Sequence, residues 1–257
     1  MLAAGNEHDR RDGRSGPYLT VVIPAYNEER RIGPSLEAIL AHARSAPYRT
    51  EILVVDDGST DRTIEVSRAA LKGVPDARVV ENVANRGKGY SVRHGVMEAA
   101  GDVVLLTDAD LSTPIQEVDS LLRHLGEIGH GIVIGSRALK ESRIEVHQNP
   151  AREMMGKTFN RLVRAFTGLP FNDTQCGFKL MTLRDTLPIF RKARVDGFSW
   201  DVEILYIAVR RGVPVKEVGV TWRNAAGSKV GVLTEPWRMF RDIIKIRSAY
   251  RRGLYDA

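Results

Sequence analysis

The sequence contains one cysteine, Cys176, among 257 residues. A single cysteine excludes an internal disulfide and favours a reducing compartment. The sequence also lacks any apolar run of the roughly 18 to 20 residues that a membrane-spanning helix needs. Residues 1–17 are polar and glycine-rich, so they do not resemble a secretory signal and are predicted to form a disordered leader. We therefore expect a cytoplasmic protein, either free or peripheral on the cytoplasmic face of a membrane.

Two common nucleotide-binding signatures are missing. No Gly-x-Gly-x-x-Gly follows the first predicted strand, which argues against NAD binding, and "NRGKG" (residues 85–89) lacks the spacing of an NTPase phosphate loop. Aromatic residues make up only 7% of the chain. The basic residues are not interleaved with them as in a base-stacking platform, so nucleic acid is not an expected partner. The net charge of +6 nevertheless favours an anionic partner.

Short β-branched runs alternate with segments of helical spacing from Tyr18 onward. This alternation predicts an α/β fold, a single domain with a mostly parallel sheet flanked by helices. After Arg137 the pattern changes, and a polar, mobile loop is predicted over residues 138–153. The predicted strands are residues 19–24, 51–56, 77–82, 102–107, 131–136 and 213–222, with helices at 157–166 and 200–211 and an extended piece at 174–181.

Each of the first five predicted strands ends in an unusual polar cluster. In chain order these clusters are "PAYNEE", "DDGSTD", "NRGKG", "TDAD" and "GSR". Ligands of open α/β sheets bind outside the carboxyl ends of the strands. We therefore expect the five clusters to converge on one crevice.

The cluster "TDAD" places Asp108 and Asp110 two residues apart at a strand end. Carboxylates with this spacing reach one hard cation when the backbone turns. Mg²⁺ usually binds through one or two carboxylates together with substrate phosphates. The alternative is an ordinary turn with a helix cap, and residues 108–110 considered alone would favour it. The polar clusters at the other strand ends favour a metal site instead.

The remaining clusters have similar alternatives. Asp56 is predicted to accept hydrogen bonds from a base or ribose, whereas Asp57 with Ser59 makes a turn and helix cap. Tyr26 offers a flat face for a base. Lys88 either meets a phosphate or is a solvated loop lysine, and the glycines around it allow a close backbone approach.

These residues, in this order, resemble glycosyltransferase family 2, whose members have the GT-A fold. The resemblance runs from about Leu19 to Arg247. In the second half, "DTQCGFKL", "WDVEIL" and "VTWRNAAGSKV" are similar to the branch that makes polyprenyl-phosphate sugars, especially dolichyl-phosphate β-glucosyltransferases and then the related mannosyltransferases. Ser112 stands where the mannosyl branch often has a metal-binding Gln, a departure that favours the glucosyl branch.

The resemblance implies roles for individual positions. It implies phosphate binding by three basic residues, and it gives Asp201 and Arg223 catalytic roles. Asp201 is the candidate base, with Glu203 as its competitor. The implied site comprises Pro24, Ala25, Tyr26, Glu28, Asp56 and Asp57 around the nucleotide, Ala109 near the ribose, Asp108 and Asp110 on Mg²⁺ or Mn²⁺, and Arg137, Arg223 and Lys229 on phosphates.

The implied reaction is the inverting, metal-dependent transfer of a hexose from a nucleotide-sugar to a polyprenyl or dolichyl phosphate, with UDP-glucose as the expected donor. Alternatives are GDP-mannose as donor or a soluble hydroxyl acceptor. A phosphate monoester has a second pKa of about 6 and needs no base at pH 7, whereas a sugar hydroxyl does. Cys176 is expected to be a small buried hydrophobe, not a nucleophile.

The same resemblance gives the organisation of the chain. We predict a GT-A domain over residues 18–232, with a donor half at 18–137 and an acceptor half at 150–232. Residues 233–257 are predicted to form a basic amphipathic helix. This helix either packs on the core or lies at an anionic membrane surface, and sequence alone slightly favours core packing.

Overall fold

The computed structural model describes residues 16–147, 149–224 and 235–255. The predicted leader therefore lies almost wholly outside the described residues, as does Lys229. The central sheet has seven strands in the order β3-β2-β1-β4-β7-β5-β8, all parallel except β7. The predicted α/β architecture is thus confirmed. The strands are β1 Leu19–Ala25, β2 Thr50–Asp56, β3 Ala77–Glu81, β4 Val103–Leu106, β5 Ile132–Ser136, β7 Lys179–Thr182 and β8 Val215–Gly219.

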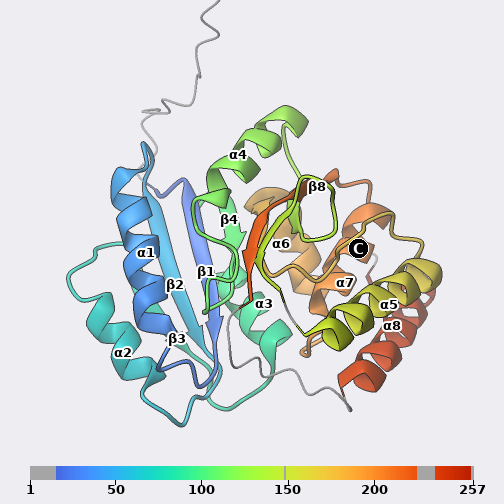
Figure 1. Ribbon diagram of the computed structural model, residues 1–257, viewed down its shortest axis with the longest axis horizontal. Helices are drawn as coiled ribbons and strands as arrows, with labels where there is room; N and C mark the ends of the chain where they lie inside the picture. The colour runs from blue at the N-terminus through green and yellow to red at the C-terminus, as the bar shows by residue number, and fades with distance from the viewer. Residues whose placement is uncertain (1–15, 148, 225–234, 256–257) are drawn as a thin grey trace, which may run out of the picture.

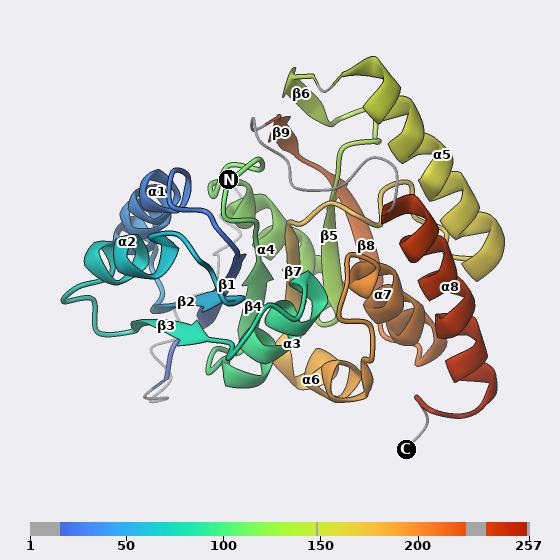
Figure 2. The ribbon, with the colours of Figure 1, turned by 90° about the horizontal axis from the view of Figure 1, so that it is seen from below.

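Helices cover both faces of this sheet (Figures 1 and 2). Helices α1, α2 and α4 pack on one face, while α3, α6 and α7 pack on the other. Successive residues of β1 point to opposite faces and both sets are buried, which is why the strand is apolar throughout. The helices are α1 Ile32–Ser45, α2 Thr63–Ala70, α3 Lys88–Glu98, α4 Glu117–Ile128, α5 Pro150–Thr167, α6 Leu183–Lys192, α7 Trp200–Arg210 and α8 Glu235–Arg251.

Helices α5 and α8 lie side by side beyond the β8 edge of the sheet (Figure 2). Phe166 of α5 and Phe240 of α8 form an edge-to-face pair with ring centroids 5.2 Å apart. Helix α8 buries Ile243 and Ile246 in the main core. The apolar face of the predicted amphipathic helix therefore packs on the protein, as one of its two alternatives requires. Among the described residues, no helix is both long enough and apolar enough to cross a bilayer.

Three elements differ from the sequence predictions. The predicted loop over residues 138–153 contains a strand, β6 (Arg143–Val146), and the first turn of α5. Strand β6 was missed because its partner, β9 (Thr221–Arg223), lies far along the chain and forms a separate two-stranded sheet with it. The predicted strand over 213–222 is accordingly divided between two sheets. Helix α6 was not predicted and has Pro188 inside it, a residue that normally ends a helix.

Candidate active site

The carboxyl ends of β1 and β2 form one hydrogen-bonded unit. The amide of Asp57 donates to the carbonyl of Ala25 at 2.8 Å, and the amide of Asn27 donates to Ser59 Oγ at 2.9 Å. Asn27 has a φ of 53°, a left-handed conformation that Asn tolerates better than most residues. Its Oδ1 accepts from the amide of Thr60 at 2.8 Å. Ser59 and Thr60 therefore tie the two strand ends together. The cap predicted for Ser59 is wrong, because Arg62 is the residue at the N-cap of α2.

Asp56 and Asp57 have different partners. The carboxylate of Asp57 accepts from Asn82 Nδ2 at 2.8 Å and from the amides of Arg86 at 3.0 Å and Gly87 at 2.8 Å. It thus fixes the "NRGKG" loop from within. Asp56 Oδ2 accepts from the amide of Ser59 at 2.9 Å and closes the turn that had been assigned to Asp57. Asp56 Oδ1 is buried without a hydrogen-bond partner among the described residues, an exception to the rule that buried polar atoms are hydrogen-bonded.

The turn after β4 carries both predicted metal ligands. Lys88 Nζ donates to Asp108 Oδ1 at 2.5 Å, while Arg31 Nη1 lies 3.5 Å from Asp110 Oδ2. Asp110 Oδ1 accepts from the amide of Ser112 at 3.0 Å. Leu111, between Asp110 and Ser112, has a φ of 44°, and this conformation turns the backbone sharply. The two side chains are 37% and 22% exposed, so a ligand has access to both.

The two carboxylates at this turn have pKa values shifted in opposite directions. Burial alone would raise the pKa of Asp108, but the Lys88 ammonium lowers it below its ordinary value. Burial, and then the neighbouring Asp108 charge, raise the pKa of Asp110. Two partly exposed carboxylates that repel each other fit a hard divalent cation such as Mg²⁺ or Mn²⁺. The described residues contain no cluster of three or more His, Cys, Asp or Glu that would hold a metal.

Helix α1 and the residues before it support this turn. Ser35 Oγ donates to the carbonyl of the buried Ala109 at 2.7 Å. The Glu28 carboxylate accepts from Arg31 Nε and Nη2 at 2.6 and 2.7 Å, and Arg31 also reaches Asp110. Arg31 was not singled out from sequence, although its spacing of three residues from Glu28 was visible. Of the other predicted pocket residues, Pro24 is partly buried, Ala25 is buried and Tyr26 is exposed at this edge.

Gly177 lies directly against Asp108 and was not predicted. A Cβ built on Gly177 would lie 2.6 Å from Asp108 Cγ and 2.7 Å from Oδ1, with Oδ2 closer still. This contact arises because β7 is antiparallel to β4, so that Lys179 at its start pairs with Leu106 at the end of β4. Any side chain at position 177 would therefore push the Asp108 carboxylate out of its observed position. The glycine of "QCGF" is visible in the sequence, but the sequence does not indicate that β7 runs antiparallel to β4.

A buried cation lies beneath this part of the site. The Lys179 side chain is 1% exposed, and its Nζ donates to the carbonyl of Cys176 and lies 4.0 Å from Asp201 Oδ2. Burial raises the pKa of Asp201 to about 6, with Lys179 opposing that shift. At pH 7 about nine in ten Asp201 carboxylates are therefore ionised. Burial also raises the pKa of the Cys176 thiol, in keeping with a buried apolar residue.

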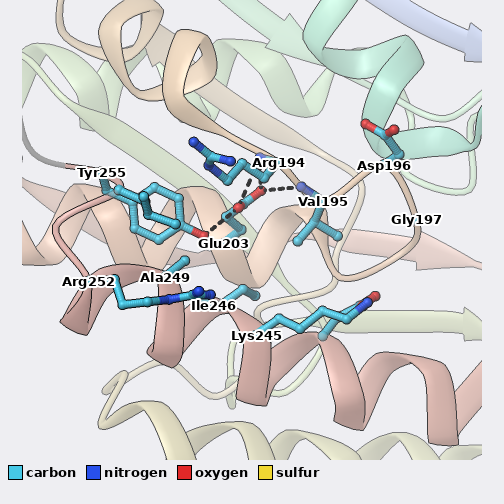
Figure 3. A pocket seen from close by; sticks show the side chains of 12 residues that line it. Arg194, Val195, Asp196, Gly197, Glu203, Lys245, Ile246, Ala249, Arg252 and Tyr255 are labelled. Atoms are coloured by element: carbon cyan, nitrogen blue, oxygen red, sulfur yellow. Dashed lines mark hydrogen bonds and ion pairs between the residues drawn. The ribbon is translucent and has the colours of Figure 1, made fainter.

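Glu203, the competing acid, has a different environment. It is fully buried, and its carboxylate accepts from the backbone amides of Arg194 and Val195 and from the Tyr255 hydroxyl (Figure 3). Asp201 Oδ2, by contrast, lies 4.0 Å from Lys179 Nζ, and its Oδ1 accepts from the amide of Val202 at 2.7 Å. The two acids therefore have different partners, and their predicted roles stay predictions.

The predicted phosphate-binding arginines have carboxylate partners. Arg137 donates to Asp173 through Nε at 2.7 Å, Nη2 at 2.9 Å and its backbone amide at 3.0 Å. Burial alone would raise the pKa of Asp173, but Arg137 lowers it to about 2. Arg223 is exposed and paired with Glu145, and its amide donates to the carbonyl of Ser112 at 2.7 Å. Both arginines border the site, but a phosphate there must share them with a carboxylate.

The seven-stranded, mostly parallel sheet with helices on both faces is the architecture of the GT-A fold class. A solved structure agrees with this fold. The glucosyl-3-phosphoglycerate synthase of Mycobacterium tuberculosis, in complex with Mn²⁺ and UDP-glucose, has a TM-score of 0.63 and 21% identity and covers 93% of this chain and 80% of its own.

The sequence comparisons narrow the class. The family model described as glycosyl transferase family 2 matches residues 20–184. The dolichyl-phosphate β-glucosyltransferase of Drosophila melanogaster is 36% identical over 249 residues, which are 92% of this chain and 76% of the relative. Its counterpart in Saccharomyces cerevisiae is 33% identical over 255 residues, or 93% of this chain and 76% of the relative. The chain belongs to glycosyl transferase family 2.

Proposed function

We propose that this protein is an inverting, metal-dependent hexosyltransferase that moves glucose from UDP-glucose onto a polyprenyl or dolichyl phosphate. The observation that carries the proposal is that the carboxylates of Asp108 and Asp110 lie in the same turn after β4. At the same edge of the sheet, Asp56 Oδ1 is buried without a partner among the described residues. The names of the relatives support the glucosyl donor and the lipid-phosphate acceptor.

The donor would lie across the ends of β1, β2 and β4. Asp56 Oδ1 accepts a hydrogen bond from the base or ribose, and Tyr26 covers the base. Asp108 and Asp110 hold Mg²⁺ or Mn²⁺, and the Mn²⁺ in the synthase complex supports a divalent ion here. When bound, this ion supplies Lewis-acid stabilisation of the diphosphate charge.

The chain's own cations complete the neutralisation of the leaving diphosphate. Lys88 lies at Asp108, and Arg137 and Arg223 border the turn. Charge placed where it develops in the transition state is a large contribution to catalysis. Lys229 keeps its predicted phosphate role, although it lies outside the described residues.

Asp201 has a role that depends on the acceptor. A phosphate acceptor is largely a dianion at pH 7, so Asp201 would orient it and need not remove a proton. A soluble hydroxyl acceptor would require a base, and a carboxylate with a pKa of about 6 is suited to that task. This hydroxyl transfer is the alternative function.

We also propose that the protein docks on an anionic membrane surface through α5 and α8. The two helices are neighbours, and both expose apolar side chains, Met154 and Leu162 on α5 and Trp237 and Ile244 on α8. Basic residues of α8, such as Arg241 and Lys245, would contact lipid headgroups, each contributing about 1 kcal/mol near an anionic surface. Such docking would bring a lipid-linked acceptor to the enzyme.

A screen of radiolabelled donors tests the proposal. UDP-glucose, GDP-mannose and UDP-N-acetylglucosamine are each supplied with a short polyprenyl phosphate and either Mg²⁺ or Mn²⁺. We expect organic-extractable product from UDP-glucose, and its loss in the Asp110→Ala variant. Label found only in water-soluble product favours the hydroxyl acceptor. Full transfer in excess chelator would overturn the metal-dependent reaction.

A further inference from the structure

Glu203 and Tyr255 form a buried pair that none of the proposed steps uses. Tyr255 Oη donates to Glu203 Oε1 at 2.6 Å, and both residues are buried. Burial, and then the Glu203 charge, raise the pKa of Tyr255, so its hydroxyl remains a donor. Figure 3 shows the pair at the wall of a cavity of about 420 Å³ lined by α7, α8 and the 194–197 segment. The Tyr255 ring itself belongs to the main core, and this hydrogen bond gives its hydroxyl a directed contact with Glu203.

Glu203 also holds the segment that precedes α7. Its carboxylate accepts from the amide of Arg194 at 3.0 Å and from that of Val195 at 2.8 Å. In these bonds two consecutive, partly buried backbone amides donate to one carboxylate. Hydrogen bonds to a charged acceptor are stronger than those between neutral groups. Glu203 therefore holds the start of the 194–197 segment, while Arg93 of α3 donates to Asp196 Oδ1 at 2.6 Å.

The same segment contacts the loop that presents Lys88. The carbonyl of Asp196 accepts from the amides of Gly89 at 2.8 Å and Tyr90 at 3.2 Å. A Cβ on Gly87 would lie 2.5 Å from that carbonyl oxygen, and one on Gly89 would lie 2.7 Å from Trp200 Cβ. The two backbones are thus in direct contact, without room for a methyl group. A shift of either segment must move the other.

Tyr255 belongs to the segment that follows α8. Its carbonyl accepts from Arg211 Nη2 at the end of α7, so the segment is held at two points. Helix α8 itself is anchored in the core by Ile243 and Ile246. Direct contacts therefore run from α8 through Tyr255, Glu203 and the 194–197 segment to the loop that places Lys88 at Asp108.

We propose that Tyr255 and Glu203 are positioning residues for nucleotide-sugar binding: they fix the 194–197 segment, and through it the Lys88 loop. This inference rests on the proposed donor site. Removing the hydroxyl of Tyr255 would loosen the Lys88 loop without touching any residue that contacts the donor. Movement of α8, the helix proposed to meet the membrane, would be transmitted to donor binding by the same contacts.

The test uses Tyr255→Phe, with Thr20→Val as a matched control. Thr20 Oγ1 also donates to a buried carboxylate, Glu51 Oε2 at 2.7 Å, but at the amino ends of β1 and β2, whereas the site lies at their carboxyl ends. For Tyr255→Phe we expect the KM for UDP-glucose to rise about tenfold, with the KM for polyprenyl phosphate unchanged. Amide hydrogen exchange should become faster at Gly89 and Tyr90. In Thr20→Val, both quantities should remain those of the wild type.

Three results would overturn the inference. One is an unchanged donor KM in Tyr255→Phe with faster exchange confined to Arg194 and Val195, which would make the pair a local contact only. Another is unchanged exchange at Gly89 and Tyr90. The third is an equal rise in donor KM in Thr20→Val, which would indicate general loss of stability. A wild type that transfers no sugar would instead contradict the proposed function, and the exchange measurement would still test the mechanical link.

Discussion

The two halves of this protein contribute to the site in different ways. In the first half, Asp108, Asp110 and Lys88 lie on turns at strand ends and remain partly exposed, where a ligand reaches them. In the second half, the charged residues Lys179 and Glu203 are buried beneath that surface. Burying a charge is costly unless it is paired and hydrogen-bonded. The difference indicates that the predicted metal ligands come from the first half, while buried charges of the second half support the surface beneath them.

Removing a carboxylate from the exposed half should have the largest effect. We expect Asp108→Asn to lower transfer about 100- to 1,000-fold. The metal ion would lose a carboxylate ligand, and the diphosphate would then lose the positive charge that the ion supplies. The measurement is the initial rate of glucose transfer at saturating Mn²⁺. Asp119→Asn on α4, an exposed acid whose side chain pairs with His42, serves as the control and should transfer normally. Equal rates for Asp108→Asn and the wild type would remove the metal turn from the reaction.

Gly177 tests the contact between the halves. In Gly177→Ala the new methyl group displaces the Asp108 carboxylate, and we expect Mn²⁺ affinity in the presence of UDP to fall about 10- to 100-fold. Titration calorimetry measures this affinity directly. Gly156→Ala on α5 adds a methyl group where nothing lies within 4 Å and should leave Mn²⁺ binding intact. If both variants bind Mn²⁺ equally well, the fit of Gly177 against Asp108 is unimportant.

Asp201 tests the buried half through pH. The groups that act on its pKa are Lys179 on β7, Lys88 on α3 and Asp173 before β7, and burial raises that pKa to about 6. Below pH 6 the carboxylate is protonated, so if transfer needs the anion, the rate should fall as the pH falls and reach about one tenth of its maximum at pH 5. In Asp201→Asn this decline should disappear. A decline that persists in the variant would come from the acceptor phosphate, which titrates in the same range.

The smallest effect is expected at the surface of α8. Trp237 is 72% exposed, so Trp237→Ala should weaken flotation with anionic liposomes about three- to tenfold and leave the Tm unchanged. Ile243→Ala is the matched change on the buried face and should lower the Tm instead. Wild-type protein that remains at the bottom of the gradient would contradict membrane docking.

What the sequence predicted follows the same division. The five strands and their polar ends were predicted because apolar β-branched runs and strand-end motifs are local patterns. Asp108 and Asp110 lie in one turn, and Asp56 Oδ1 is buried without a hydrogen-bond partner in the described part of the chain. The predicted roles of these residues, and of Asp201, stay predictions.

The supporting contacts could not be predicted, because they join residues far apart in the chain. Glu203 and Tyr255 are 52 positions apart, and Arg137 and Asp173 are 36 apart. Gly177 meets Asp108 only because β7 runs against its neighbours. Strand direction depends on the whole topology and leaves no trace in a four-residue strand.

The reversed strand has a further consequence for the lengths of the segments at the site. Strands β1, β2 and β4 reach it with their last residues, so the chain leaves the site there and must begin a turn. Strand β7 reaches it with its first residues, so the segment before β7 arrives from outside. Insertions upstream of Gly177 would change the surroundings of Asp108 while the turns at Asp56 and Asp108 keep their length. The segment before β7 can therefore vary without altering the turns that carry Asp56, Asp108 and Asp110.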